Sequence, residues 1–131
     1  MKKEHITREI ILAAMRVHSE LGSGLLESAY EACLFHELIK QGFKVERQKP
    51  VPIRYDGILI DCGYRVDLLV NDEIIIELKA VERVLPIHHA QIISYLKLAG
   101  KEIGLLINFH VVHLRDGITR KINDLNSVGT S

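Results

Sequence analysis

One stretch of the chain, residues 64–80, constrains the fold most strongly. It contains two apolar runs, YRVDLLV and IIIELKA, separated by the polar residues NDE. Apolar runs that alternate with period two around a short polar break are typical of a β-hairpin. Asp67, Glu77 and Lys79 interrupt this alternation. The geometry of the hairpin therefore decides whether these three charged side chains lie together.

The length of the hairpin loop determines which charges face one another. A two-residue loop mixes charged side chains into the apolar face, because a shift of one residue moves a strand's side chains to the opposite face. A three-residue loop, residues 71–73, separates apolar from charged positions. Glu77 and Lys79 then share a face because they are two residues apart. The hydrophobic pattern favours this loop, with the pairs Val70–Ile74, Leu68–Ile76 and Asp67–Glu77.

Two carboxylates in this arrangement need a compensating charge. At roughly 5 Å and an effective dielectric constant of about 20, they repel one another by about 3 kcal/mol. A lysine offsets part of this repulsion. A hard divalent cation such as Mg²⁺ offsets more of it and leaves positions open for water and phosphate oxygens. The alternative interpretation is a solvated strand end with a cross-strand ion pair, and the spacing alone does not exclude it.

Composition places the chain among small globular proteins. Its 131 residues are 47% hydrophobic and 26% charged, which predicts one domain with an adequate core. The formal net charge of zero argues against broad nonspecific nucleic-acid binding but leaves a local basic groove open. Cys33 and Cys62 fit free thiols better than a disulfide framework or a zinc site. Without a membrane-spanning stretch or a signal peptide, we expect a cytoplasmic protein.

Two helices are expected before the hairpin. The first covers residues 7–21, with Thr7 as N-cap and a stop at Gly22. The second covers about residues 25–40 and ends at Gly42. Both carry apolar residues at helical spacing, so we expect each to bury one face.

The remaining elements are mostly extended. Residues 44–55 and 58–62 flank Asp56-Gly57, a type I′ turn signal. A third helix runs from Pro86 to a stop at Gly100, and the continuous apolar run 103–109 predicts a strand buried on both faces.

A second hairpin is expected near the C-terminus. Residues 111–114 and 118–122 flank another Asp-Gly pair, Asp116-Gly117. The tail 123–131 lacks periodicity, and we expect it to be flexible. The domain of residues 1–131 would then have its core at about residues 5–122.

The order αα-βββ-α-β, with Asp-x9-Glu-x-Lys on adjacent strands, resembles the core of the PD-(D/E)xK nuclease superfamily. Within it, GLLESAY at residues 24–30 resembles the motif that names the GxxExxY family. YRVD at 64–67, ELK at 77–79 and QIISY at 91–95 follow in the family's order. Val66 replaces the proline of the superfamily's name. The resemblance implies an α/β (α+β) fold with a restriction-endonuclease-like core: a mixed central sheet flanked by helices, and a C-terminal hairpin.

The resemblance also implies a metal-dependent nuclease site. Asp67 and Glu77 would bind Mg²⁺ or Mn²⁺, with the backbone carbonyl of Leu78 as a further ligand. Lys79 would position or activate the attacking water and stabilise charge on the phosphorus. Glu27 resembles the additional acidic residue that completes such sites in many superfamily members.

Three further residues carry over from the family motifs. Gln91 and Tyr95 match a Q-x-x-x-Y element that touches phosphate or holds the lysine, and Tyr30 is the tyrosine of the GxxExxY motif. Each has a structural alternative: helix surface for Gln91, a rim aromatic for Tyr95 and a packing residue with a tethered hydroxyl for Tyr30. Glu27 has one too, because acidic residues are favourable in the first turn of any helix.

These observations lead to two functional hypotheses. The first is a metal-dependent nuclease that hydrolyses phosphodiester bonds in DNA or RNA, since a carboxylate-held metal supplies hydroxide and neutralises charge on phosphate oxygens. The second is a catalytically inactive nuclease-fold module that binds nucleic acid or a protein partner. It is motivated by the neutral charge and small size of the chain. The small size also leaves a homodimer or a larger assembly open.

Overall fold

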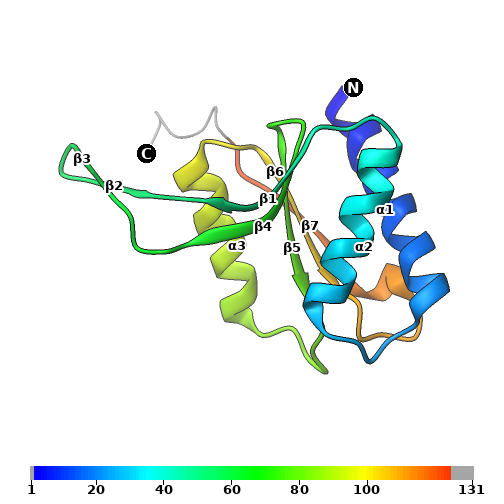
Figure 1. Ribbon diagram of the computed structural model, residues 1–131. Helices are drawn as coiled ribbons and strands as arrows, with labels where there is room; N and C mark the ends of the chain where they lie inside the picture. The colour runs from blue at the N-terminus through cyan, green and yellow to red at the C-terminus, as the bar shows by residue number, and fades with distance from the viewer. Residues whose placement is uncertain (1, 125–131) are drawn as a thin grey trace.

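A five-stranded mixed sheet forms the centre of the molecule (Figure 1). The structure is a computed structural model, and it describes residues 2–124. The strand order is β1-β4-β5-β6-β7, and β5 and β6 are the parallel pair. The strands are β1 (Val45–Pro50), β4 (Arg65–Val70), β5 (Ile74–Lys79), β6 (Ile103–Asn108) and β7 (Ile118–Ile122).

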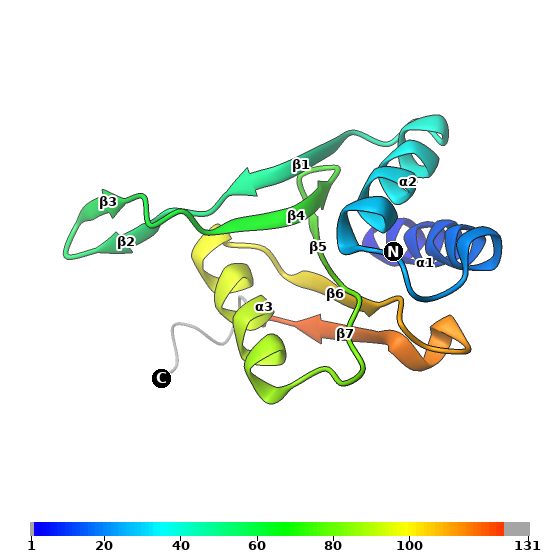
Figure 2. The same cartoon turned by 60° about the horizontal axis from the view of Figure 1, so that its bottom comes forward.

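Helices cover both faces of this sheet (Figure 2). On one face lie α1 (Lys2–Leu21) and α2 (Glu27–Lys40), which pack on a cluster that includes Ile76. On the other face lies α3 (Pro86–Ala99), which packs on a second cluster that includes Ile75. Neighbouring residues of β5 thus contact different helices, and β5 and β6 are buried on both faces, as parallel strands usually are. The expected α/β architecture is confirmed.

The chain leaves the sheet between β1 and β4 to form a projecting arm (Figure 1). The arm consists of β2 (Ile53–Tyr55) and β3 (Ile58–Ile60), which pair antiparallel in a separate two-stranded sheet. Asp56 and Gly57 join them with φ angles of 52° and 77°. Two successive positive φ angles are what a type I′ turn requires, as the Asp-Gly pair predicted.

The β4–β5 hairpin has the register that the hydrophobic pattern predicted. Val70 pairs with Ile74 and Leu68 pairs with Ile76, which leaves a three-residue loop at 71–73. The expectation of one aliphatic and one charged face was wrong near the turn. There, Leu69 and Ile75 occupy the face that carries the charges further along, and both are buried with α3 residues. These central strands therefore have two apolar faces, because α3 adds a second hydrophobic layer.

The first helix begins earlier than expected. Thr7 is not an N-cap but a buried residue inside α1, and its hydroxyl donates to the carbonyl oxygen of Lys3 at 2.8 Å. A threonine in a helix interior can satisfy its hydroxyl in this way, so its presence alone does not mark a helix start. None of the helices within residues 2–124 combines the length and apolar character needed to cross a membrane.

The C-terminal hairpin differs from the expectation. Strand β7 pairs antiparallel with β6, while residues 111–113 form bends rather than a strand. A short 3₁₀ helix, η1 (Leu114–Gly117), contains the Asp-Gly pair. A side chain at Gly117 would overlap the carbonyl oxygen of Asn108. Glycine is therefore required here for the close approach of η1 to the end of β6, and not for a two-residue hairpin turn.

The tail is held further than expected. Asn123, at the start of the predicted flexible tail, is buried, and its side-chain amide donates to the carbonyl oxygen of Lys101 at 3.1 Å. Of the rest of that predicted tail, Asp124 is exposed and residues 125–131 lie outside the described residues.

Tyr30 ties the loop before α2 to the hydrophobic core. Its ring stacks on Phe109 with centroids 4.3 Å apart. Its hydroxyl donates to the carbonyl oxygen of Gly22 at 2.6 Å and accepts from the backbone N–H of Leu25 at 3.2 Å. Because this loop leads directly to Glu27, Tyr30 helps to determine where the first turn of α2 lies.

We expect Tyr30→Phe to lower the free energy of unfolding by about 1–2 kcal/mol. The ring stacking is retained, but two backbone groups of the loop lose their hydrogen-bond partner. Urea denaturation monitored by circular dichroism measures the change. The matched control is Tyr55→Phe, an exposed ring in the arm, which should change the free energy of unfolding by less than about 0.5 kcal/mol. Equal effects of the two substitutions would contradict this role of Tyr30.

Candidate active site

The hydrogen-bond ladder between β4 and β5 ends where Asp67 faces Glu77. Backbone pairing extends only to Leu68 and Ile76, and beyond them the strands diverge, β4 towards the arm and β5 away from it (Figure 1). Side chains replace the ladder at this fork. The backbone N–H of Asp67 donates to Glu77 Oε2 at 2.7 Å, and the N–H of Leu78 donates to Asp67 Oδ2 at 2.7 Å. We call Asp67 and Glu77 the carboxylate pair.

Burial makes negative charge costly at the carboxylate pair. Glu77 is only 6% exposed, and burial, followed by the charge of Asp67, raises its pKa to about 8. The nearby charge of Lys79 opposes this shift in the pKa of Glu77. Burial also raises the pKa of Asp67, against hydrogen bonds from Leu78 and Gln48. The site therefore binds protons strongly when no cation is present.

Lys79 lies at the end of β5, two residues after Glu77 and on the same face of the strand. Its side chain is partly exposed. Within residues 2–124 its amine forms neither an ion pair nor a hydrogen bond. The amine is thus available to a ligand at the carboxylate pair.

A polar network from α2 and β1 holds Asp67 from its other side. The side-chain amide of Gln48 donates to Asp67 Oδ1 at 3.2 Å and to Glu31 Oε1 at 2.7 Å. Arg47 Nε donates to Glu31 Oε2 at 3.1 Å. Gln48 has a φ of 50°, a left-handed conformation that is strained for a residue with a side chain. Sequence reasoning assigned no role to these three residues. A signal was present in Glu31, which follows Glu27 by four positions and so lies on the same face of α2.

Gln91 and Tyr95 approach the site from α3. Tyr95 is only 5% exposed and packs in the cluster that contains Val66, the neighbour of Asp67 in β4. Burial, followed by the charge of Glu77, raises the pKa of Tyr95, whereas a side-chain hydrogen bond with Gln91 opposes this shift. These two residues therefore lie in the surroundings of the carboxylate pair.

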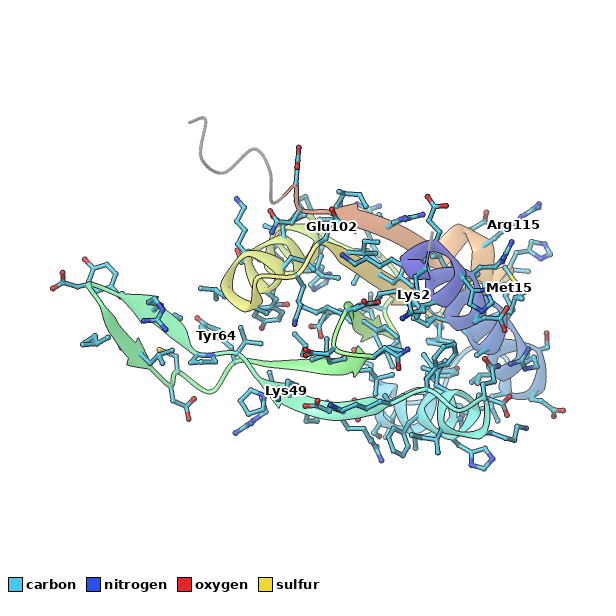
Figure 3. The ribbon with its side chains drawn as sticks, turned by 90° about the horizontal axis from the view of Figure 1, so that it is seen from above. Lys2, Met15, Lys49, Tyr64, Glu102 and Arg115 are labelled. Atoms are coloured by element: carbon cyan, nitrogen blue, oxygen red, sulfur yellow. The ribbon has the colours of Figure 1, made fainter. Side chains whose placement is uncertain are left out.

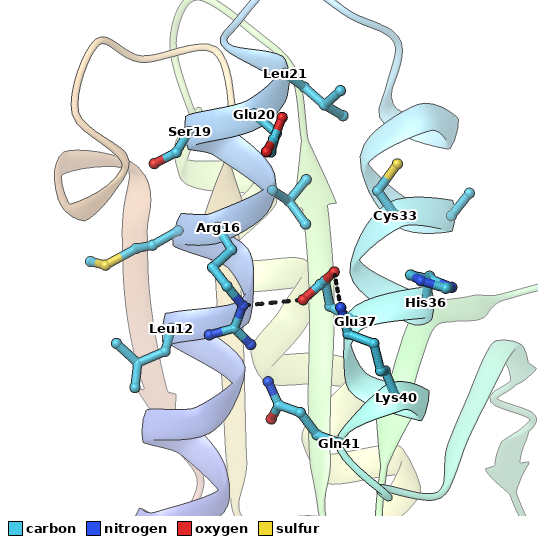
Figure 4. Close-up of a pocket in the computed structure, with 13 residues that line it drawn as sticks. Leu12, Arg16, Ser19, Glu20, Leu21, Cys33, His36, Glu37, Lys40 and Gln41 are labelled. Atoms are coloured by element: carbon cyan, nitrogen blue, oxygen red, sulfur yellow. Dashed lines mark hydrogen bonds and ion pairs between the residues drawn. The ribbon is translucent and has the colours of Figure 1, made fainter.

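A large hollow lies elsewhere. It occupies about 990 Å³ between α1 and α2, and Glu37 spans it with ion pairs to Arg16 and Lys40 (Figure 4). None of the residues predicted for the site lines this hollow. Residues of α1 and α2 line it.

A comparison with models of protein families shows the family of this chain. The family model of the PD-(D/E)XK nuclease superfamily matches residues 4–121. The chain belongs to the PD-(D/E)XK nuclease superfamily. This match and the helix-flanked mixed sheet confirm the expected restriction-endonuclease-like fold. No curated protein and no solved structure matches the chain.

PD-(D/E)XK nucleases generally use divalent metals, and the carboxylate pair fits such an ion. Mg²⁺ typically takes one or two protein carboxylates and keeps several waters. A cation would also relieve the repulsion that contributes to the raised pKa of Glu77. Glu27, exposed at the start of α2, is close enough for its charge to raise the pKa of both Asp67 and Glu77. Within residues 2–124, however, no three His, Cys, Asp or Glu side chains are grouped as ligands of one ion.

We expect Glu77→Gln to stabilise the metal-free protein increasingly as pH rises. The pKa of Glu77 is about 8 when folded and about 4.5 when unfolded, so the folded state holds a proton that the unfolded state releases between these values. The stability from this proton is complete below pH 4.5 and is lost as pH rises through 8. The advantage of the glutamine variant should therefore grow by about 1 kcal/mol per pH unit between pH 5 and 8.

Chemical denaturation of both proteins in EDTA, at intervals from pH 5 to 9, measures this difference. Comparison with the wild type at each pH cancels the titration of groups that do not interact with Glu77. A difference in the free energy of unfolding that stays constant with pH would contradict the raised pKa.

Proposed function

We propose that this protein is a metal-dependent nuclease of the GxxExxY type that hydrolyses phosphodiester bonds in DNA or RNA. One observation carries the proposal: the half-buried carboxylate of Asp67 and the buried carboxylate of Glu77 face one another at the fork of β4 and β5, with Lys79 following on the same face. Membership of the nuclease superfamily supports it. We propose that the protein acts as a single domain and that it acts in the cytoplasm.

The carboxylates and the lysine have distinct tasks. Asp67 and Glu77 would hold Mg²⁺ or Mn²⁺, with the carbonyl of Leu78 as a further ligand and Glu27 closing the site from α2. A bound cation would supply an activated water and neutralise charge on the phosphate oxygens. The amine of Lys79 donates hydrogen bonds to the attacking water or to a phosphate oxygen. It thereby stabilises the negative charge that develops as the bond breaks.

The surrounding residues orient this machinery. Gln48 holds one oxygen of Asp67 while Glu31 fixes the amide of Gln48, so the carboxylate is set before any ligand binds. Gln91 and Tyr95 act from α3 on phosphate or on Lys79. Tyr30 acts indirectly, because its hydroxyl is hydrogen-bonded to the loop that leads to Glu27.

We expect the purified protein to cleave nucleic acid only with Mg²⁺ or Mn²⁺, and Asp67→Asn and Lys79→Ala to reduce the rate by at least 100-fold. Electrostatic stabilisation of this kind typically contributes 10²–10³ in rate. The assay uses labelled single- and double-stranded DNA and RNA. Asp72→Asn, in the exposed β4–β5 turn, and Lys40→Ala, on α2, are the matched controls. Equal cleavage by wild type and site variants would identify a contaminating nuclease.

A noncatalytic nuclease-fold module is the second candidate, and one observation favours it. Both carboxylates accept backbone N–H groups across the fork, and no three-residue ligand group is formed in the described part of the chain. If the carboxylates are occupied by these backbone N–H groups and hold no metal ion, the protein would bind nucleic acid or protein without hydrolysing it.

Calorimetric titration with Mn²⁺ distinguishes the two candidates. A nuclease should bind Mn²⁺ with a Kd of about 1 mM or tighter, because its carboxylates must hold the ion, and Glu77→Ala should abolish the heat of binding. Asp72→Asn should leave it unchanged. Absence of binding by the wild type would favour the noncatalytic module.

A further inference from the structure

A second hollow includes Gln91 and Tyr95, the two α3 residues in the surroundings of the carboxylate pair. It has a volume of about 510 Å³, within the range of pockets that hold small ligands. Residues at the base of the arm and on α3 line it. Its walls are mainly aromatic and aliphatic, with Tyr64, Tyr95, Ile53, Ile87 and Leu98 among them.

The two tyrosines of this hollow differ in solvent exposure. Tyr95 is 5% exposed and is held in the buried cluster beneath α3, whereas Tyr64 is 43% exposed. The two ring centroids are 6.0 Å apart, and the ring planes are tilted by 52°. Figure 3 shows Tyr64 at the base of the arm. Tyr95 therefore supports the ring of Tyr64, and the exposed part of that ring is available to a flat partner.

Residues of the hollow lie near the proposed active site. Tyr64 precedes Asp67 by three positions, a distance of about 10 Å in extended chain. Gln91 lines the hollow and hydrogen-bonds to Tyr95. A ligand that rests on Tyr64 thus places its neighbouring groups near the carboxylate pair.

The charge of the hollow favours an anionic partner. Of the described residues that line it, Lys97 is the one that carries a charge, and Gln91 and Ser94 are neutral hydrogen-bonding groups. A ring face for stacking with a cation at the rim is the combination by which proteins bind single-stranded nucleic acid. A base inside a duplex is stacked on its neighbours on both sides, so its face is not accessible to such a ring.

We propose that this hollow binds an unpaired base of single-stranded nucleic acid, which stacks on Tyr64 while Lys97 contacts an adjacent phosphate. The inference rests on the proposed function, because it names the form of nucleic acid that the carboxylate pair receives. It assigns Tyr64 to substrate binding and leaves the hydrolytic step to Asp67, Glu77 and Lys79.

Fluorescence anisotropy in EDTA tests the proposal without cleavage. The probes are a labelled oligothymidylate, an oligomer of equal length that contains abasic residues, and a duplex. We expect the oligothymidylate to bind at least fivefold more tightly than the abasic oligomer, since base–aromatic stacking typically contributes this much or more. Tyr64→Ala should remove the preference, and Tyr64→Phe should retain it. Tyr55→Ala, which removes an exposed tyrosine of the arm outside the hollow, should also retain it.

Three outcomes would overturn the proposal. The first is equal binding of the base-containing and abasic oligomers by the wild type, and the second is an unchanged preference in Tyr64→Ala. The third is a dimer, seen by light scattering, that Ile87→Glu dissociates, because a second copy of the chain would then cover the hollow.

The cleavage assay separates this inference from the proposed function. If Tyr64→Ala cleaves duplex and single strands as the wild type does, the nuclease proposal stands and the stacking proposal fails. If Tyr64→Ala loses the binding preference while neither the wild type nor the variant cleaves nucleic acid, the stacking proposal stands and the nuclease proposal fails.

Discussion

The reciprocal pairing of two carboxylates with two backbone N–H groups is the interaction on which the site depends. Where β4 and β5 diverge, the N–H groups of Asp67 and Leu78 lose strand partners, and the side chains of Glu77 and Asp67 replace them. An unpaired buried N–H is costly, so the two carboxylates support the fold. The same burial raises their pKa values.

The rest of the structure can be understood as support for this fork. Helix α2 contributes Glu31, which holds Gln48 in a left-handed backbone conformation next to Asp67. Strain of this kind persists only where surrounding contacts impose it. On the opposite face, α3 places Tyr95 in the apolar layer next to the site. Helices thus support the surroundings of the fork from both faces of the sheet.

Much of the fold was predictable, because it depends on short-range periodicity. The alternation of apolar residues set the three-residue hairpin loop and the register of β4 and β5. The Asp-Gly pair set the type I′ turn of the arm, and Pro86 and Gly100 bounded α3. The errors arose where one local signal has several causes. Asp116-Gly117 marks a close approach to β6 rather than a hairpin turn, and Thr7 satisfies its hydroxyl inside a helix instead of capping one.

The sequence by itself determined that Asp67 lies opposite Glu77 and that Lys79 shares the face of Glu77, because strand alternation and loop length are properties of neighbouring residues. It did not determine which side chains reach these residues from other elements. Gln48 and Glu31 reach the site, and Tyr95 reaches Tyr64, only through tertiary structure, since β1 pairs with β4 while α2 and α3 pack on the sheet. Tertiary structure also decided that Glu27 does not form a three-residue ligand group with Asp67 and Glu77 within the described residues. Such contacts depend on how helices pack on the twisted sheet, and no period in the sequence encodes that packing.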